Sequence, residues 1–453
     1  MPDWRGIILP KRAPAATPPG MYHYRIERPD RHSRVHLRVE KDGSALMLLD
    51  ATVAIHLNET AAEIAKAVLE GHGLDDTVRR IRALFRGASK EQIARDFEKI
   101  RGILFPPEHE EDACPWLTLA SAEAEPFSAR VSAPYRADLA LTYRCQNNCP
   151  HCYVEREKDM PSLSEKEWLR ALDILWEATV PHICFTGGEA TLCEFLPRLV
   201  EHAEDLGQVS GLLTNGRRLS DRAYCRELIG AGLDHVQITV ESCDPAVHNA
   251  MVGAEGHAET IQGLRNMLAE DIYVVTNTTL TQRNLPQIEE TIDFLHGLGL
   301  RTFACNSLIH AGGGKANKGE LTIAQLRNVL PLVAERVRAA GMRFIWYTPT
   351  PYCRMNPVEL ELGFKRCTAA EYNICVEPNG DVLPCQSCYR AAGNILQRKW
   401  DEIWNGDIFR DIRERLSVPD ECRTCPDFPV CGSGCPLSRD HDVVFCQDRV
   451  SEG

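Results

Sequence analysis

The amino-acid sequence predicts an α/β protein: a partial (β/α)6 TIM-like barrel, preceded by a winged-helix-like α+β domain and followed by a small cysteine-rich domain. Three observations support this prediction. Between residues 137 and 345, short apolar strands alternate with helical segments, which is the pattern of a parallel sheet. Nearer the N-terminus, strands are instead followed by a run of helices, and cysteines crowd together from Cys353 onward.

The first hundred residues contain the pattern of a small α+β domain. An Asp42-Gly43 turn separates two apolar runs, which predicts a hairpin, and a further apolar run predicts a third strand. The three expected strands are 35–39, 45–49 and 51–57. Three amphipathic helices follow, the first capped by Asn58 and the third opened by a capping box of Ser89 and Gln92.

An acidic, proline-rich linker separates this domain from the barrel. The expected divisions are a tail 1–21, a first domain 22–105, a linker 106–136, a barrel 137–345 and a C-terminal domain 346–453. The expected barrel strands are 138–143, 182–186, 210–214, 235–240, 273–279 and 302–306. Chemistry in such folds gathers at the carboxyl ends of the strands, so motifs that directly follow strands are the candidates for a site.

Composition restricts the function. The 453 residues carry a net charge of −13, which argues against a nucleic-acid partner. The N-terminal residues resemble no signal peptide and no apolar run could span a bilayer, so we expect a cytoplasmic protein without a membrane partner. Nineteen cysteines in a reducing compartment favour metal ligation over disulfides.

Three of these cysteines form a tight triplet, Cys145-x3-Cys149-x2-Cys152, directly after the first barrel strand. Iron–sulfur clusters normally take four thiolates, so three ligands leave one iron open to a substrate or cofactor. A zinc half-site or chance spacing is the alternative, and the position after the first strand argues against it.

The triplet together with Gly187-Gly188-Glu189 after the second strand resembles the radical S-adenosylmethionine (SAM) superfamily. The resemblance implies a cluster whose open iron chelates SAM and passes it an electron, giving a 5′-deoxyadenosyl radical that abstracts hydrogen from the substrate. The two glycines would let the backbone approach the methionine ammonium of SAM, and Glu189 would provide its counter-charge.

Further SAM contacts are expected at the ends of other strands. The run 236–241 resembles the fourth strand of this superfamily, with Thr239 and Glu241 as departures from its usual Ser-x-Asp ending. Asn215 and Asn277 are weaker candidates, and polar capping of loop backbone is the alternative for both. His151, which lies between two expected ligands, is expected to pack on the cluster.

The C-terminal cysteines resemble the seven-cysteine SPASM extension of radical SAM enzymes. Their order is Cys367-x12-Gly380-x4-Cys385, then Cys422-x2-Cys425-x5-Cys431-x3-Cys435, then Cys446. By this resemblance a distal cluster would be held by Cys422, Cys425, Cys431 and Cys446. A proximal cluster would be held by Cys367, Cys385 and Cys435. The resemblance therefore implies three [4Fe-4S] clusters, one binding SAM and two auxiliary.

The fourth ligand of the proximal cluster remains open. Cys353 is the leading candidate, with Cys375 and Cys388 as alternatives that could equally be small buried hydrophobic residues. A zinc ribbon is the alternative for the Cys422 to Cys435 segment. No general base can be named from the sequence.

The N-terminal domain resembles the PqqD-like recognition element of enzymes that modify ribosomally made peptides, in which an extended leader peptide adds a strand to the sheet edge. With the other two resemblances it implies a maturase that crosslinks or otherwise oxidises a precursor peptide, with flavodoxin or ferredoxin as reductant. A winged-helix domain serving only for packing or dimerisation is the alternative.

Three other functions are weighed against the peptide maturase. A sulfatase maturase usually has aspartate after the cysteine of the Gly-x4-Cys segment, where this chain has Gln386. A maturase of a non-peptide cofactor is the second alternative. A non-catalytic iron–sulfur electron carrier is the third, but it would have no use for an open three-cysteine cluster beside Gly-Gly-Glu.

Overall fold

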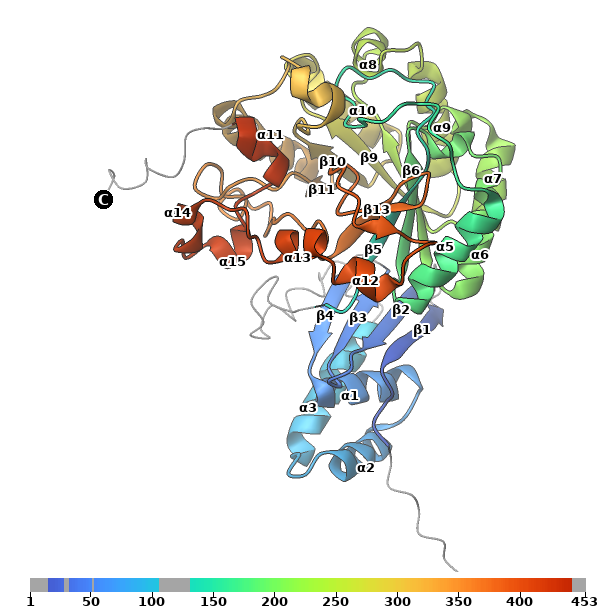
Figure 1. The fold of residues 1–453 in the computed structure, drawn as a ribbon, viewed down its shortest axis with the longest axis vertical. Helices are drawn as coiled ribbons and strands as arrows, with labels where there is room; N and C mark the ends of the chain where they lie inside the picture. Colours follow the sequence, from blue (N-terminus) through green and yellow to red (C-terminus); the bar gives the residue numbers. More distant parts are fainter. Residues whose placement is uncertain (1–14, 28–31, 51–52, 106–130, 442–453) are drawn as a thin grey trace, which may run out of the picture. The chain divides into compact units, whose positions relative to one another are not determined.

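The computed structural model describes residues 15–27, 32–50, 53–105 and 131–441 (Figure 1). The chain forms two compact units, residues 1–125 and 126–453. Among the described residues, no helix has both the length and the apolarity needed to cross a membrane.

The first unit has an antiparallel sheet of four strands in the order β1-β2-β3-β4, one strand more than the sequence predicted. The strands are β1 (Gly20–Glu27), β2 (His32–Val39), β3 (Ala45–Leu49) and β4 (Val53–Leu57). The prediction missed the edge strand β1, which pairs along its whole length with β2. Only Ile26 of β1 is buried, so the strand lacks the clear apolar alternation that identifies β2.

Three helices follow the sheet, as predicted: α1 (Glu59–Leu69), α2 (Leu74–Leu84) and α3 (Lys90–Leu104). The Asn58 side chain caps α1 and the Ser89 side chain caps α3, as expected. Apolar residues of the helices and of one sheet face form a common core that includes Leu37, Met47 and Ile64. This unit therefore has its own hydrophobic core.

The second unit is built on an open ten-stranded sheet in the order β11-β10-β9-β8-β7-β6-β5-β12-β13-β14. Strands β5 to β11 are all parallel to their neighbours. These strands are β5 (Arg136–Thr142), β6 (His182–Gly187), β7 (Val209–Thr214), β8 (His235–Thr239), β9 (Tyr273–Thr279), β10 (Thr302–Asn306) and β11 (Arg343–Trp346). The six predicted barrel strands are confirmed to within two residues, and the seventh, β11, was too short to be recognised.

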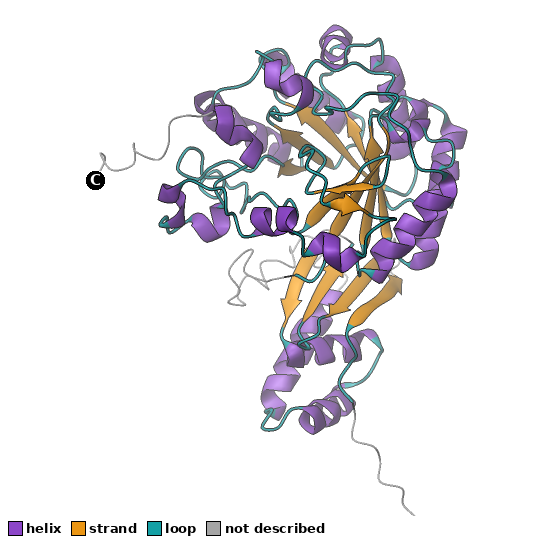
Figure 2. Ribbon diagram, viewed as in Figure 1, coloured by secondary structure: helices purple, strands orange, loops and turns teal. Residues whose placement is uncertain are grey.

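Helices cover one side of this curved sheet, as Figure 2 shows. They are α5 (Glu165–Glu177), α6 (Leu196–Leu206), α7 (Arg222–Gly230), α8 (Pro245–Val252), α9 (His257–Leu268), α10 (Ile288–Gly297) and α11 (Ile323–Ala339). Short 3-10 turns are η1 (Ala190–Leu192), η2 (Arg218–Ser220), η3 (Leu285–Gln287), η4 (Gly312–Ala316) and η5 (Pro436–His441). Buried apolar residues such as Trp168, Phe185 and Phe303 fill the interface between the sheet and the helices.

The C-terminal segment continues the same sheet. Its strands are β12 (Asn373–Val376), β13 (Asp381–Leu383) and β14 (Gly393–Asn394), and β12 pairs in parallel with β5. Its helices are α12 (Trp400–Trp404), α13 (Asp407–Arg413), α14 (Asp420–Arg423) and α15 (Phe428–Cys431). The pairing of β12 with β5 places the C-terminal cysteine region beside the strand that leads into the Cys145 triplet.

Candidate active site

The loop carrying Cys145, Cys149 and Cys152 follows β5 and is held by backbone contacts on both sides. The Asn148 amide donates to the carbonyl of Val252 at the end of α8 (2.9 Å), and the Gly313 amide donates to the carbonyl of Cys152 (2.7 Å). A side chain at Gly253 would overlap the Asn148 carbonyl, and one at Gly312 would press on the carbonyls of the Cys152 segment. The sequence analysis missed these glycines, although the Gly312-Gly313-Gly314 run was a usable signal.

The three thiols suit a multi-iron cluster better than a single ion. In the described part of the chain, only His182, Cys184 and His235 bring three possible ligand atoms within 4.8 Å of one another. The triplet thiols are therefore spaced more widely than the ligands of one zinc ion. They are still close enough to interact: burial raises the pKa of Cys149 most, and the charges of Cys152 and Cys145 raise it further. The donor set fits a cluster that spans several irons.

Gly187 and Gly188 pack against the backbone that leads into this loop. Gly187 has a positive φ of 140°, and a side chain there would overlap the Thr142 carbonyl oxygen. A side chain at Gly188 would overlap the carbonyl of Tyr143, and the Gly188 amide donates to the Thr142 carbonyl (2.7 Å). The two glycines thus have a structural role, joining the end of β6 to the start of the cysteine loop.

The Glu189 carboxylate is buried and joins three loops. Its Oε1 accepts hydrogen bonds from the amide of Thr191 (3.1 Å) and from the hydroxyls of Thr191 (2.7 Å) and Thr214 (2.6 Å). Its Oε2 accepts a hydrogen bond from the Asn215 amide (2.8 Å). The Glu189 amide donates to the Arg144 carbonyl (2.9 Å). This residue therefore ties the loops after β5, β6 and β7 together.

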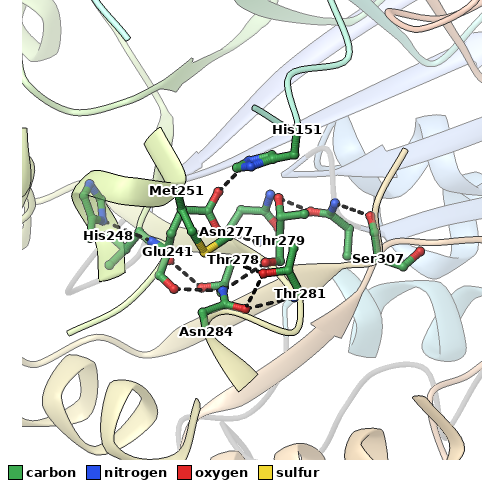
Figure 3. A network of polar contacts seen from close by, with 12 residues as sticks. His151, Glu241, His248, Met251, Asn277, Thr278, Thr279, Thr281, Asn284 and Ser307 are labelled. Atoms are coloured by element: carbon green, nitrogen blue, oxygen red, sulfur yellow. Dashed lines mark hydrogen bonds and ion pairs between the residues drawn. The ribbon is translucent and has the colours of Figure 1, made fainter. Parts of the chain in front are cut away.

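Glu241, just beyond the end of β8, forms the second buried carboxylate of the site (Figure 3). Its Oε1 lies 3.1 Å from Nε2 of His151, and its Oε2 accepts a hydrogen bond from the Thr279 amide (2.8 Å). Burial alone would lower the pKa of His151, but the hydrogen bond and negative charge of Glu241 raise it above its ordinary value. The expected packing of His151 on the cluster omitted this contact, which ties the cysteine loop to the end of β8.

Polar side chains fix the backbone around Glu241. The Asn284 amide group donates to the carbonyls of Glu241 and Thr279, both at 2.9 Å. Nδ1 of His248, on α8, lies 3.3 Å from the Glu241 amide nitrogen. These contacts, drawn in Figure 3, hold the Glu241 loop on the adjacent elements.

Two buried polar atoms at the carboxyl ends of neighbouring strands lack a partner within the described residues: Nδ2 of Asn215, after β7, and Oδ1 of Asn277, on β9. The other ends of these side chains are used, since Asn215 Oδ1 accepts from the Arg217 amide (3.0 Å) and Asn277 Nδ2 donates to Asn306 (2.8 Å). Thr239, the last residue of β8, is half-buried. An unused donor and an unused acceptor suit a small polar ligand at this edge.

Cys385, Cys388, Cys367 and Cys435 form one group in the C-terminal region. Cys385 and Cys388 are joined by an isolated β-bridge, and the Cys388 amide donates to the Cys385 carbonyl (3.2 Å). After burial, the charges of Cys367, Cys388 and Cys435 all raise the pKa of Cys385. Burial and then Cys367 likewise raise the pKa of Cys435, to about 11. The four thiols are therefore near enough to interact electrostatically, but no three of their sulfur atoms lie within 4.8 Å of one another.

The remaining C-terminal cysteines lie in other surroundings. Cys422, Cys425 and Cys431 sit on consecutive turns that include α14 and α15, and the Tyr352 amide lies 3.4 Å from the Cys431 sulfur. Cys353, next to Tyr352 in sequence, is thus close to this second group of cysteines. Cys375 is packed among Ala140, Tyr143 and Leu383 in a small apolar cluster. Cys446 lies outside the described residues.

Gln386 connects the C-terminal region to the interior of the barrel. Its amide nitrogen donates to the carboxylate of Asp138 on β5 (2.6 Å), and its oxygen accepts from the hydroxyl of Tyr153, the residue after the third cysteine of the triplet. Asp138 is buried and paired with Arg136 (2.9 Å). The sequence analysis missed Asp138, because a single carboxylate within a strand carries no motif.

Comparisons with known proteins agree with this geometry. Residues 139–295 match the model of the radical SAM superfamily, and residues 367–426 match an iron–sulfur cluster-binding domain, SPASM. A PqqA peptide cyclase of Streptomyces rochei is 31% identical over 67% of this chain and 85% of the relative, and one of Bradyrhizobium diazoefficiens is 28% identical over 71% and 91%.

Solved structures share the fold at low sequence identity. Streptococcus suis SuiB bound to its precursor peptide SuiA superposes with a TM-score of 0.68 at 18% identity, covering 92% of this chain and 97% of SuiB. The structure of anSMEcpe with bound AdoMet superposes with a TM-score of 0.54 at 16% identity, covering 69% and 92%. The first of these matches extends beyond the second unit of this chain.

Proposed function

This chain belongs to the radical SAM enzymes with an iron–sulfur cluster-binding SPASM domain, the family of the PqqA peptide cyclases. We propose that it cleaves SAM reductively and oxidises a ribosomally made peptide by forming a crosslink in it. The observation that carries the proposal is the meeting of three loops at one sheet edge. The cysteine triplet after β5, Glu189 after β6 and Asn215 after β7 are joined there by direct hydrogen bonds.

In this proposal the triplet holds the [4Fe-4S] cluster that would supply SAM with an electron. Glu189 receives the methionine ammonium, since its Oε2 accepts one hydrogen bond among the described residues and has a lone pair left. The remaining SAM contacts come from Gly187, Gly188, Asn215, Thr239, Glu241 and Asn277. The unpaired Nδ2 of Asn215 and Oδ1 of Asn277 support this assignment.

Two auxiliary [4Fe-4S] clusters complete the proposed set. The distal cluster keeps the ligands implied by the family resemblance: Cys422, Cys425, Cys431 and Cys446. For the proximal cluster we favour Cys388 over Cys353 as the fourth ligand, beside Cys367, Cys385 and Cys435. The β-bridge between Cys385 and Cys388 supports this choice, whereas the Tyr352 contact puts Cys353 beside Cys431.

The first unit is the proposed peptide-binding domain, a PqqD-like fold over residues 22–105. Its antiparallel sheet has two edge strands, β1 and β4, and an extended leader peptide could pair with an edge through backbone hydrogen bonds. The precursor peptide bound to SuiB, a protein that matches this chain over both units, supports a peptide substrate. The same proposal divides the second unit into a radical SAM core, residues 137–345, and a SPASM domain, residues 346–453. It also names flavodoxin or ferredoxin as the reductant.

The test is anaerobic turnover. The reconstituted enzyme would be incubated with SAM, reductant and each short peptide encoded beside its gene, with the Cys145/Cys149/Cys152 triple alanine variant as control. We expect 5′-deoxyadenosine and a peptide lighter by two hydrogens from the native enzyme only. SAM cleavage that leaves every such peptide unchanged would refute the peptide substrate, and absence of SAM cleavage would refute the radical chemistry.

A further inference from the structure

A second group of metal-ligand side chains lies on the interior face of the sheet, apart from all cysteines discussed above. His182 and Cys184 are on β6, two residues apart, so both point to the same face. In the strand register Cys184 is opposite Gly211 of β7, and Gly211 is opposite His235 of β8. Three neighbouring strands therefore bring these side chains together.

The three ligand atoms converge on one point. Nε2 of His182 lies 2.8 Å from Nε2 of His235 and 3.4 Å from the Cys184 sulfur, and all three atoms are within 4.8 Å of one another. A hydrogen bond between two neutral imidazoles accounts for the first contact alone. Nε2 of His182 has either one proton or one lone pair, which it must share between His235 and Cys184, whereas a cation between the three atoms takes a separate lone pair from each.

Gly211 makes this arrangement possible. A side chain on Gly211 would overlap the imidazole of His235, which lies across β7. Only glycine at this position lets the His235 ring reach over the middle strand toward His182 and Cys184. The strand register and this glycine together form the space.

We propose that His182, Cys184 and His235 bind a zinc ion. Two imidazole nitrogens around tetrahedral zinc lie about 3.3 Å apart, and a thiolate sulfur lies about 3.5 Å from each nitrogen. The observed distances of 2.8 and 3.4 Å reach these values after one ring moves by about 0.5 Å. No fourth protein ligand lies within the described group, so a water molecule completes the tetrahedron.

The position of the site points to a structural role. His182 and His235 are the first residues of β6 and β8, at the amino ends of the strands, whereas the cysteine triplet follows the carboxyl end of β5. Residues at the amino ends of barrel strands usually serve stability. Arg136 and Asp138 of β5 stand opposite His182 and Cys184 in the strand register. The Arg136 guanidinium opposes a cation, but the Asp138 carboxylate paired with it balances this charge. The zinc site is independent of the proposed SAM chemistry.

The test is metal analysis of the reconstituted full-length enzyme after a chelator wash. We expect about one zinc per chain, with X-ray absorption at the zinc edge fitted by one sulfur at about 2.3 Å and by nitrogens at about 2.0 Å. His182→Gln and His235→Gln should lose the zinc and keep the iron, while Cys225→Ala, at a buried cysteine outside the group, should keep both.

Three results would overturn the proposal: no zinc in the wild-type enzyme, zinc surrounded by four sulfurs as in a misloaded cysteine site, or equal zinc in the His182 and Cys225 variants. If the histidine variants fail to fold, the sulfur count in the wild-type spectrum still decides, because it needs no variant.

Discussion

The buried Glu189 carboxylate offers the sharpest test of how this site is assembled. In Glu189→Gln the side-chain oxygen can still face the three donors from Thr191 and Thr214, but the new NH2 group must then face the Asn215 amide. The change therefore replaces one charge-assisted hydrogen bond by two opposed donors. Hydrogen bonds to charged groups contribute about 1.5–3 kcal/mol, so the loops should open more easily by about 2–3 kcal/mol.

This loss can be measured where it occurs. Amide hydrogen exchange in the SAM-free, reconstituted enzyme reports the opening free energy of individual segments. Because about 1.4 kcal/mol corresponds to a factor of ten, protection of residues 190–193 and 214–217 should fall about 30- to 150-fold. Glu194→Gln makes the same chemical change at an exposed carboxylate nearby and should leave protection unchanged.

The reasoning would be refuted by a specific combination of results. If Glu189→Gln exchanges within about threefold of the wild type at both segments, yet loses SAM affinity, then the carboxylate serves the ligand and does not hold the loops. If both properties change, the residue does both, as the unused lone pair on its Oε2 predicts.

Three further predictions concern other parts of the second unit. Cys388→Ser should alter the electron paramagnetic resonance signal of the proposed proximal cluster or lower the iron content, whereas Cys353→Ser should leave both unchanged. The opposite pattern would restore Cys353 as the ligand. Gly188→Ala should lower iron loading at the triplet and abolish SAM cleavage, because its side chain overlaps the Tyr143 carbonyl, and normal loading would contradict this. Burial lowers the pKa of His248 from its ordinary 6.5 to about 4 and outweighs the negative charge of Glu241, which raises this pKa. Below pH 6.5 the unfolded state therefore binds a proton at His248 that the folded state does not bind. The stability from neutral His248 is complete above pH 6.5 and is lost as the pH falls toward 4. The free energy of unfolding should drop by about 1.6 kcal/mol between pH 6.5 and pH 5, relative to a His248→Phe variant that lacks this titration.

Local patterns in the sequence were sufficient for the six expected barrel strands and for the choice of chemistry, but not for the edge strands β1 and β11. Short apolar runs that alternate with helical segments located all six expected barrel strands, because a strand inside a parallel sheet is apolar along most of its length. The Cys145 triplet was recognisable because its ligands lie within eight consecutive residues. The Asn58 and Ser89 caps were equally local, since each bonds an amide within the first turn of its own helix.

Only the tertiary structure decided which distant residues meet. The His151–Glu241 pair joins residues 90 positions apart, and Gln386 reaches Asp138 across 248. The proposed choice of Cys388 over Cys353 rests on the bridge between Cys385 and Cys388, and the meeting of His182, Cys184 and His235 depends on the register of β6, β7 and β8. These contacts leave no pattern in the sequence because each involves single residues whose neighbours along the chain serve other purposes, and a hydrogen bond or a metal ion selects its partners by distance in space.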